Sequence, residues 1–102
     1  MTTLNIVNKS PFEKHTLEQC LSRIGDGDSV LLIEDAAVAA VNGTSYTDKL
    51  KAQAESVKLY VLQPDLDARG MADSMLVPGF NAVDYTGFVA LVTEHDRVHS
   101  WL

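Results

Sequence analysis

The sequence predicts an α/β fold of three layers, in which a mainly parallel sheet of four or five strands has helices on both faces. Residues 30–33 form an uninterrupted apolar run, Val-Leu-Leu-Ile, which is typical of a strand buried on both faces. Strand-like and helix-like segments alternate along the chain, as they do where helices connect parallel strands. The 102 residues, of which 46% are hydrophobic, suffice for one core. We therefore expect a single domain over residues 1–102.

The N-terminal third predicts a strand, a helix and a second strand. Residues 4–8 have the composition of a short strand, and Pro11 then interrupts it because proline has no backbone N–H to donate. Thr16 and Gln19 have the spacing of a capping box, so we expect Thr16 to be the N-cap of a helix. The apolar positions of this helix recur at helical spacing at Leu17, Cys20, Leu21 and Ile24. Residues 29–33 then form the buried strand.

The middle of the chain predicts more helix before the next strand. Residues 36–41 are rich in alanine and predict a short helix. Ser45 is the expected cap of a further helical piece over residues 46–55. The third strand is residues 57–62, and we expect Pro64 to end it.

The C-terminal third predicts a weak helix over residues 71–75 and a short fourth strand over residues 80–83. Asp84 is the expected cap of a helix after that strand. The apolar face of this helix is expected to contain Tyr85, Phe88, Leu91 and Val92. Residues 97–102 are interpreted as an edge strand.

Composition excludes several classes of function. The formal net charge is −6, from 14 acidic and 8 basic residues, which argues against binding a phosphate backbone and is compatible with docking to a basic protein surface. We expect no contact with nucleic acid and no membrane span, because no apolar run approaches about 20 residues. The N-terminus has no pattern of a secretion signal, so the expected compartment is the cytoplasm. Cys20 is the only cysteine, which excludes an internal disulfide.

Cys20 is the candidate nucleophile. As a thiolate it could attack another sulfur atom or carry sulfur as a persulfide. Its position on the apolar stripe also fits a second interpretation, in which it is a small buried hydrophobic residue without chemistry. Both interpretations remain open on the residues alone.

Two other patterns could bind metal. His95 and His99 would share one face of a continuous helix, but no third ligand accompanies them. Glu34-Asp35 and Asp65-Asp67 follow the second and third strands and could gather at the carboxyl edge of the sheet, where carboxylates bind Mg²⁺ or act as acid and base. More often, such residues cap the next helix and stay solvated. No phosphate-binding glycine motif is present, so no nucleotide cofactor is implied. Because the ligand patterns are also weak, we expect neither a metal nor a cofactor.

Several segments together resemble a known family. The most specific are the opening Asn-Lys-Ser-Pro-Phe of residues 8–12 and the block Tyr-Val-Leu-Gln-Pro-Asp of residues 60–65, which continues to Ala-Arg-Gly at 68–70. Residues 27–37, 83–89 and 100–101 also match. The chain thereby resembles the DsrH/TusB family of sulfur-relay subunits, which belongs to the DsrE-like superfamily. The resemblance covers nearly the whole chain.

The resemblance implies a DsrE-like fold and a cytoplasmic heterohexamer in which this subunit joins two related DsrE-like subunits. Such complexes pass persulfide sulfur between cysteines, and the principal cysteine lies in a partner subunit. The TusB branch serves 2-thiolation of the wobble uridine of tRNA. The DsrH branch serves oxidative sulfur metabolism and delivers sulfur to a small sulfur-carrier protein.

Two features favour the DsrH branch, with Cys20 as a possible persulfide carrier. Cys20 stands where DsrH-type members carry a cysteine, and the opening of the chain is closer to DsrH. The alternatives are a TusB-type subunit for tRNA thiolation and an architectural subunit with an inert Cys20.

Overall fold

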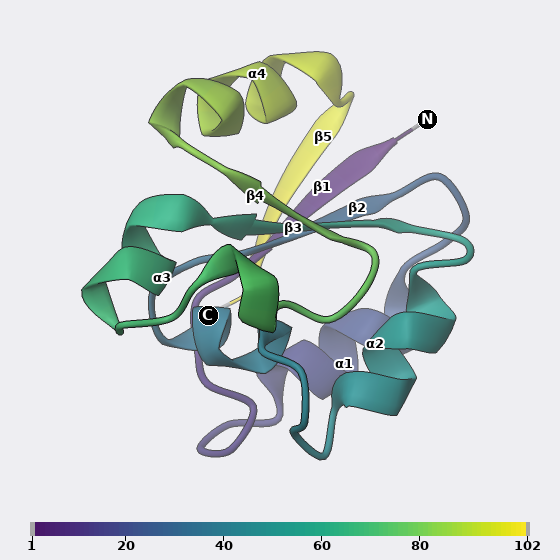
Figure 1. Ribbon diagram of the computed structural model, residues 1–102. Helices are drawn as coiled ribbons and strands as arrows, with labels where there is room; N and C mark the ends of the chain where they lie inside the picture. The colour runs from purple at the N-terminus through teal and green to yellow at the C-terminus, as the bar shows by residue number, and fades with distance from the viewer. Residues whose placement is uncertain (1, 102) are drawn as a thin grey trace.

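The computed structural model describes residues 2–101, which form a five-stranded parallel sheet with helices on both faces (Figure 1). The strand order is β4-β3-β2-β1-β5, and each neighbouring pair is parallel. The strands are β1 Thr3–Val7, β2 Ser29–Leu32, β3 Lys58–Leu62, β4 Phe80–Val83 and β5 Arg97–Trp101. The predicted fold class is confirmed, including the edge strand at the C-terminus. Leu102, the last residue of that predicted strand, lies outside the described residues.

The helices divide unevenly between the two faces of the sheet. They are α1 Thr16–Arg23, the 3₁₀ helix η1 Glu34–Ala40, α2 Thr47–Gln53, α3 Gln63–Ala68, the 3₁₀ helix η2 Asp73–Met75 and α4 Tyr85–Glu94. From β1 to β4 the chain moves across the sheet in one direction, so right-handed crossovers place the intervening helices on one face. The return from β4 to β5 reverses direction and places α4 on the opposite face, as Figure 1 shows.

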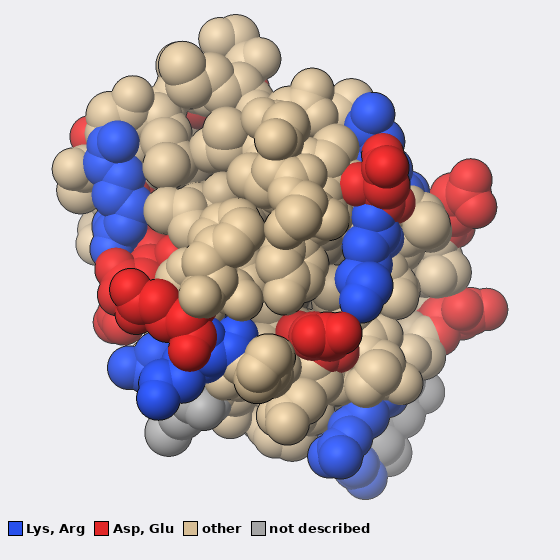
Figure 2. All heavy atoms as spheres, turned by 90° about the horizontal axis from the view of Figure 1, so that it is seen from below, with Lys and Arg blue, Asp and Glu red and all other residues tan. Residues whose placement is uncertain are grey.

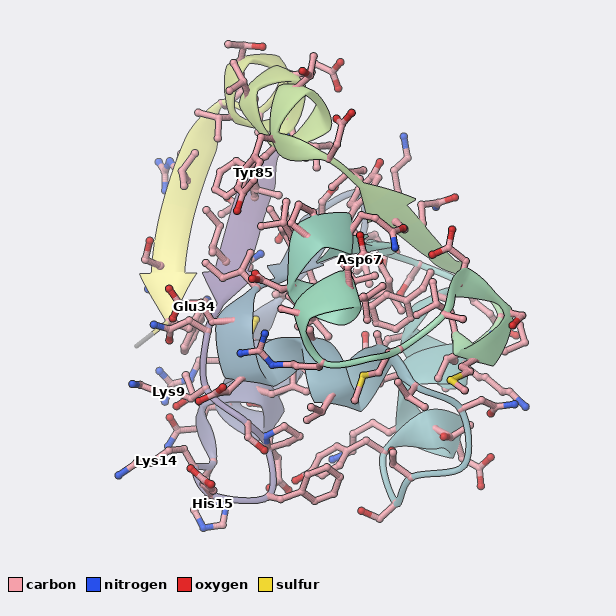
Figure 3. The ribbon with its side chains drawn as sticks, turned by 60° about the vertical axis from the view of Figure 1, so that its left-hand side comes forward. Lys9, Lys14, His15, Glu34, Asp67 and Tyr85 are labelled. Carbon is pink, nitrogen blue, oxygen red and sulfur yellow. The ribbon has the colours of Figure 1, made fainter. Side chains whose placement is uncertain are left out.

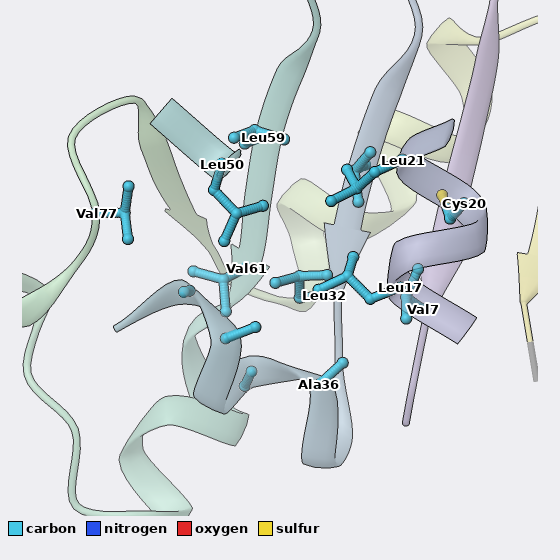
Figure 4. Packing of buried hydrophobic residues seen from close by; sticks show 14 of the residues in the cluster. Val7, Leu17, Cys20, Leu21, Leu32, Ala36, Leu50, Leu59, Val61 and Val77 are labelled. Atoms are coloured by element: carbon cyan, nitrogen blue, oxygen red, sulfur yellow. The ribbon is translucent and has the colours of Figure 1, made fainter. Parts of the chain in front are cut away.

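The buried residues form two clusters, one on each face of the sheet. The larger cluster packs α1, η1, α2 and α3 against the sheet (Figure 4). The smaller cluster is Leu4, Ile6, Leu31 and Leu91, beneath α4. In β2, Val30 and Leu32 belong to the larger cluster and Leu31 to the smaller one. The expectation that this strand is buried on both faces is therefore confirmed.

Two predicted helix caps are wrong by one residue each. Thr16 is the first residue of α1, and His15 occupies the N-cap position. The N-cap position of α2 is Tyr46, not Ser45, and the Thr47 hydroxyl accepts hydrogen bonds from the backbone N–H groups of Gly43 and Thr44 at 2.9 and 3.1 Å. Near the start of α2, Thr44, Ser45 and Thr47 could all bond the backbone, so the local pattern did not select one.

The helix predicted over residues 71–75 is misplaced. Helix α3 begins at Gln63, directly after β3, with Pro64 in its first turn. Proline is favoured there because the first helical N–H groups have no intrahelical partner and its φ suits a helix. Only the short η2, Asp73–Met75, remains of the predicted segment.

Helix α4 begins as predicted, with Asp84 as its N-cap, and Asp84 Oδ1 accepts a hydrogen bond from the Gly87 backbone N–H at 2.8 Å. We expect Asp84→Ala to lower the free energy of unfolding by about 1 kcal/mol, because it leaves that donor without its acceptor. Asp84→Asn, which keeps a side-chain oxygen, should lose much less. Urea denaturation measures both, and an Ala variant as stable as Asn would contradict the capping role.

Candidate functional site

Cys20 lies on the inner face of α1, where it is fully buried beside Leu17 and Leu21 (Figure 4). Burial, followed by the negative charge of Asp28, raises the pKa of the Cys20 thiol from 9.0 to about 12. Because the thiolate is the reactive form, this environment suppresses reaction at neutral pH. In this conformation Cys20 is a packing residue whose thiol stays protonated.

Polar side chains do gather at the carboxyl edge of the sheet, as the strand-end acids predicted. The Glu34 backbone N–H donates to Asp65 Oδ2 at 2.7 Å. The Arg69 guanidinium donates from Nη2 to Asp35 Oδ1 at 2.8 Å and from Nη1 to the Asp65 carbonyl oxygen at 3.1 Å. Arg69 thus ties the ends of β2 and β3 together. Sequence reasoning missed this role, because Asp35 lies 34 residues from Arg69.

Asp67 does not join this group. Its carboxylate accepts a hydrogen bond from Gln63 Nε2 at 2.9 Å within α3. Figure 3 shows Asp67 on α3, well separated from Glu34. Among residues 2–101, no three His, Cys, Asp or Glu side chains come together in a way that could hold a metal ion.

Glu34 and Asn8 are the unusual residues of this edge. Glu34 has a φ of 51°, in the left-handed region that favours glycine, which costs roughly 1 kcal/mol. Asn8 Nδ2 contacts Glu34 Oε2 at 3.5 Å, and Asn8 Oδ1 is buried without a hydrogen-bond partner among the described residues. Both lie near the carboxyl end of β1, beside the point where the strand order reverses. Ligands and partners of open α/β sheets bind at this position.

The loop between β1 and α1 adds positive charge to this region. Lys9 and Lys14 are exposed and extend, with His15, on the side where Glu34 lies, and they outnumber the one acid of this loop, Glu13 (Figure 3). Residues 2–101 enclose no pocket. This edge of the sheet is lined by polar and charged side chains.

The face that carries α1 and α2 bears both acidic and basic side chains. In Figure 2, which views the molecule from below, Lys, Arg, Asp and Glu side chains lie around a mainly uncharged middle. Acids and bases are mixed there, and no broad basic patch appears on this face.

The two histidines do not share a helix face, so that premise of a zinc pair was wrong. Helix α4 ends at Glu94, and His95 is its C-cap, with Nδ1 2.7 Å from the Leu91 carbonyl oxygen and Nε2 2.8 Å from Ser29 Oγ. His99 lies on β5 and stacks on Trp101, with ring centroids 4.5 Å apart. His95 thus ties the end of α4 to β2. No helix among residues 2–101 is long and apolar enough to cross a membrane.

Comparisons with known proteins agree with this geometry. The family model described as "DsrH like protein" matches residues 9–98. Curated proteins named TusB from Pectobacterium parmentieri and Enterobacter sp. (strain 638) are each 35% identical over 98 residues, which is 96% of this chain and 99% of each relative. Among solved structures, the ychN protein from E. coli has a TM-score of 0.77 at 19% identity, covering 98% of this chain and 99% of that one.

A second solved structure, MTH1491 from Methanobacterium thermoautotrophicum, is a protein of unknown function. It has a TM-score of 0.69 at 11% identity, over 96% of both chains. At these low identities the two structures establish the fold alone.

Proposed function

The chain belongs to the family of DsrH-like proteins, and on that basis we propose that it is a TusB-type subunit of a cytoplasmic sulfur-relay complex serving 2-thiolation of the wobble uridine of tRNA. One observation carries this proposal: the 35% identity to proteins named TusB extends over almost the full length of both chains. The sequence had favoured the DsrH branch. The curated relatives instead favour the alternative, so the TusB role is the primary proposal.

Within this complex we assign the chain an architectural role. It would assemble with two related DsrE-like subunits in a heterohexamer, and the principal sulfur-carrying cysteine would lie in a partner. The complete burial of Cys20 and the raised pKa of its thiol support this assignment. The open carboxyl edge, with the Arg69 ion pairs and the exposed loop of Lys9 and Lys14, offers a surface for the passing carrier protein.

A second candidate is the DsrH role in oxidative sulfur metabolism, which the presence of Cys20 favours. The Cys20 thiolate would attack the terminal sulfur of a partner's persulfide, forming Cys20–S–SH and releasing the partner's thiolate, with no net oxidation. Because the thiol is buried, this transfer requires α1 to move away from the sheet in the assembled complex.

Deleting the gene separates these candidates. We expect tRNA from the deletion strain to lose 2-thiouridine at the wobble position, as measured by mass spectrometry of digested nucleosides. Both the wild-type gene and Cys20→Ser should restore the modification if Cys20 is architectural. Unchanged thiouridine together with impaired oxidation of reduced sulfur compounds would contradict the TusB role and support the DsrH role.

Sulfur loading tests Cys20 directly. The native complex is incubated with a persulfide donor and each subunit is weighed by intact mass spectrometry. We expect the added sulfur on a partner subunit and none on this chain. A sulfur-sized increase on this chain that disappears in Cys20→Ser would instead make Cys20 a carrier.

A further inference from the structure

Helix α4 buries few of its side chains against its face of the sheet. It is the one helix assigned to that face among the described elements, and Leu91 is its only buried residue. Tyr85 and Val89 are 62% and 63% exposed, and Val92 is 37% exposed. Half of the apolar face that the sequence predicted for this helix therefore points to solvent. We call Tyr85, Val89 and Val92 the α4 surface.

The strands beside α4 add apolar side chains on the same face. Tyr60 of β3 and Val83 of β4, like Phe88 of α4 itself, pack against the smaller core cluster but are only partly buried. Val98 pairs in register with Leu4, which belongs to that cluster, so Val98 lies on the same face, and it is 44% exposed. Parallel sheets are normally covered on both faces. Exposed apolar side chains gathered on one face of a sheet are typical of an interaction site.

The charges around the α4 surface are mainly negative. Helix α4 contains no Lys or Arg, and its one charged residue is Glu94. Asp84 precedes it and Asp96 follows it, both exposed. One cation, Lys58, lies on this face. It pairs in register with Ser29, whose side chain faces α4 because its hydroxyl contacts His95 at the end of that helix. The apolar area thus lies between acidic ends.

We propose that the α4 surface docks a different subunit of the same complex, through an apolar patch flanked by Lys or Arg. This inference rests on the proposed function, which supplies the partner subunits. A second copy of this chain would bring acids against acids, which opposes association through this face. Basic flanks on the partner would complement Asp84, Glu94 and Asp96.

The test is assembly of this chain with the DsrE-like proteins of the same organism, followed by native mass spectrometry and titration. We expect Val89→Glu to weaken association at least tenfold, because it buries an unpaired charge in the interface. Its matched control is Met75→Glu, which places the same charge at another exposed apolar position, 49% exposed, on η2. The control should assemble normally. Circular dichroism checks that both variants are folded.

Charge reversal tests the partner's chemistry. Glu94→Lys should weaken association several-fold at low salt, and less at high salt because ions screen the interaction. Glu55→Lys, an equal change at an exposed acid outside the α4 surface, should have little effect.

The outcomes separate this inference from the proposed function. If the wild-type complex forms and Val89→Glu assembles as well as Met75→Glu, the α4 interface is wrong while the proposed function stands. If Glu94→Lys strengthens association, the partner is acidic there and the proposed partner is wrong. A wild-type homodimer that Val89→Glu dissociates would replace the heteromeric partner by a second copy. Failure of the wild type to join any DsrE-like protein would overturn both proposals.

Discussion

Alkylation of Cys20 is expected to be at least about a thousandfold slower in the native protein than in the unfolded chain at about pH 8. The thiol pKa rises from 9.0 to about 12 on folding, and three pKa units correspond to about a thousandfold less thiolate below pH 9. Complete burial adds a barrier to the reagent. The measurement compares labelling rates by a thiol reagent in buffer and in denaturant.

The matched control moves the thiol by two residues on the same helix. Ser22 is exposed on α1, so Ser22→Cys in a Cys20→Ser background should react at nearly the rate of the unfolded chain. If native Cys20 reacts as fast as this control, α1 opens readily and the carrier role gains support. Repeating the comparison in the assembled complex shows whether partners expose the thiol.

Because folding raises the pKa of Cys20, we also expect the protein to become less stable at high pH. Between pH 9 and 12 the unfolded chain releases the thiol proton while the native protein keeps it, so stability falls as pH rises. The loss is at most about 4 kcal/mol, at about 1.4 kcal/mol per pKa unit. Cys20→Ala should not show this loss of stability. The measurement is the free energy of unfolding against pH for the wild type and for Cys20→Ala, and the difference between the two gives the contribution of the thiol.

Replacing Leu91 by Ala should detach α4 from the sheet. Leu91 is the only buried residue of the helix and packs with Leu4, Ile6 and Leu31. Truncating such a side chain costs about 2–5 kcal/mol, from lost burial and the cavity left behind. That is a large part of the roughly 5–15 kcal/mol that stabilises a domain.

Hydrogen exchange shows where the loss occurs. In Leu91→Ala we expect protection to fall first in α4, while β1 to β3 and the larger core cluster keep theirs. Val92→Ala, at the neighbouring exposed position, should change stability by less than about 0.5 kcal/mol. Uniform loss of protection in Leu91→Ala would show that α4 and the rest of the sheet unfold as one unit.

The sequence by itself determined the class of fold and most of the strands. The apolar run of β2, the alternation of strands and helices and the Asp84 cap depend on neighbours within a few residues, so local pattern is enough to find them. The family resemblance rests on similarly local blocks. The acids that follow two neighbouring strands could gather at the carboxyl edge, because parallel strands all end there; Asp35 and Asp65 do so, and Asp67 does not.

Only the tertiary structure decided what these residues do. Arg69 pairs with Asp35, Glu34 adopts a left-handed backbone, and His95 bonds Ser29 across 66 residues. An amphipathic stripe shows that Cys20 faces inward, but burial and the charge of Asp28 together set its pKa. The same argument from helical spacing was wrong for half of the apolar face predicted for α4. Apolar side chains at helical spacing do not reveal whether the chain's own sheet or another protein covers them. Contacts between distant segments decide both the pKa of Cys20 and the exposure of the α4 side chains. Local spacing carries no information about those contacts.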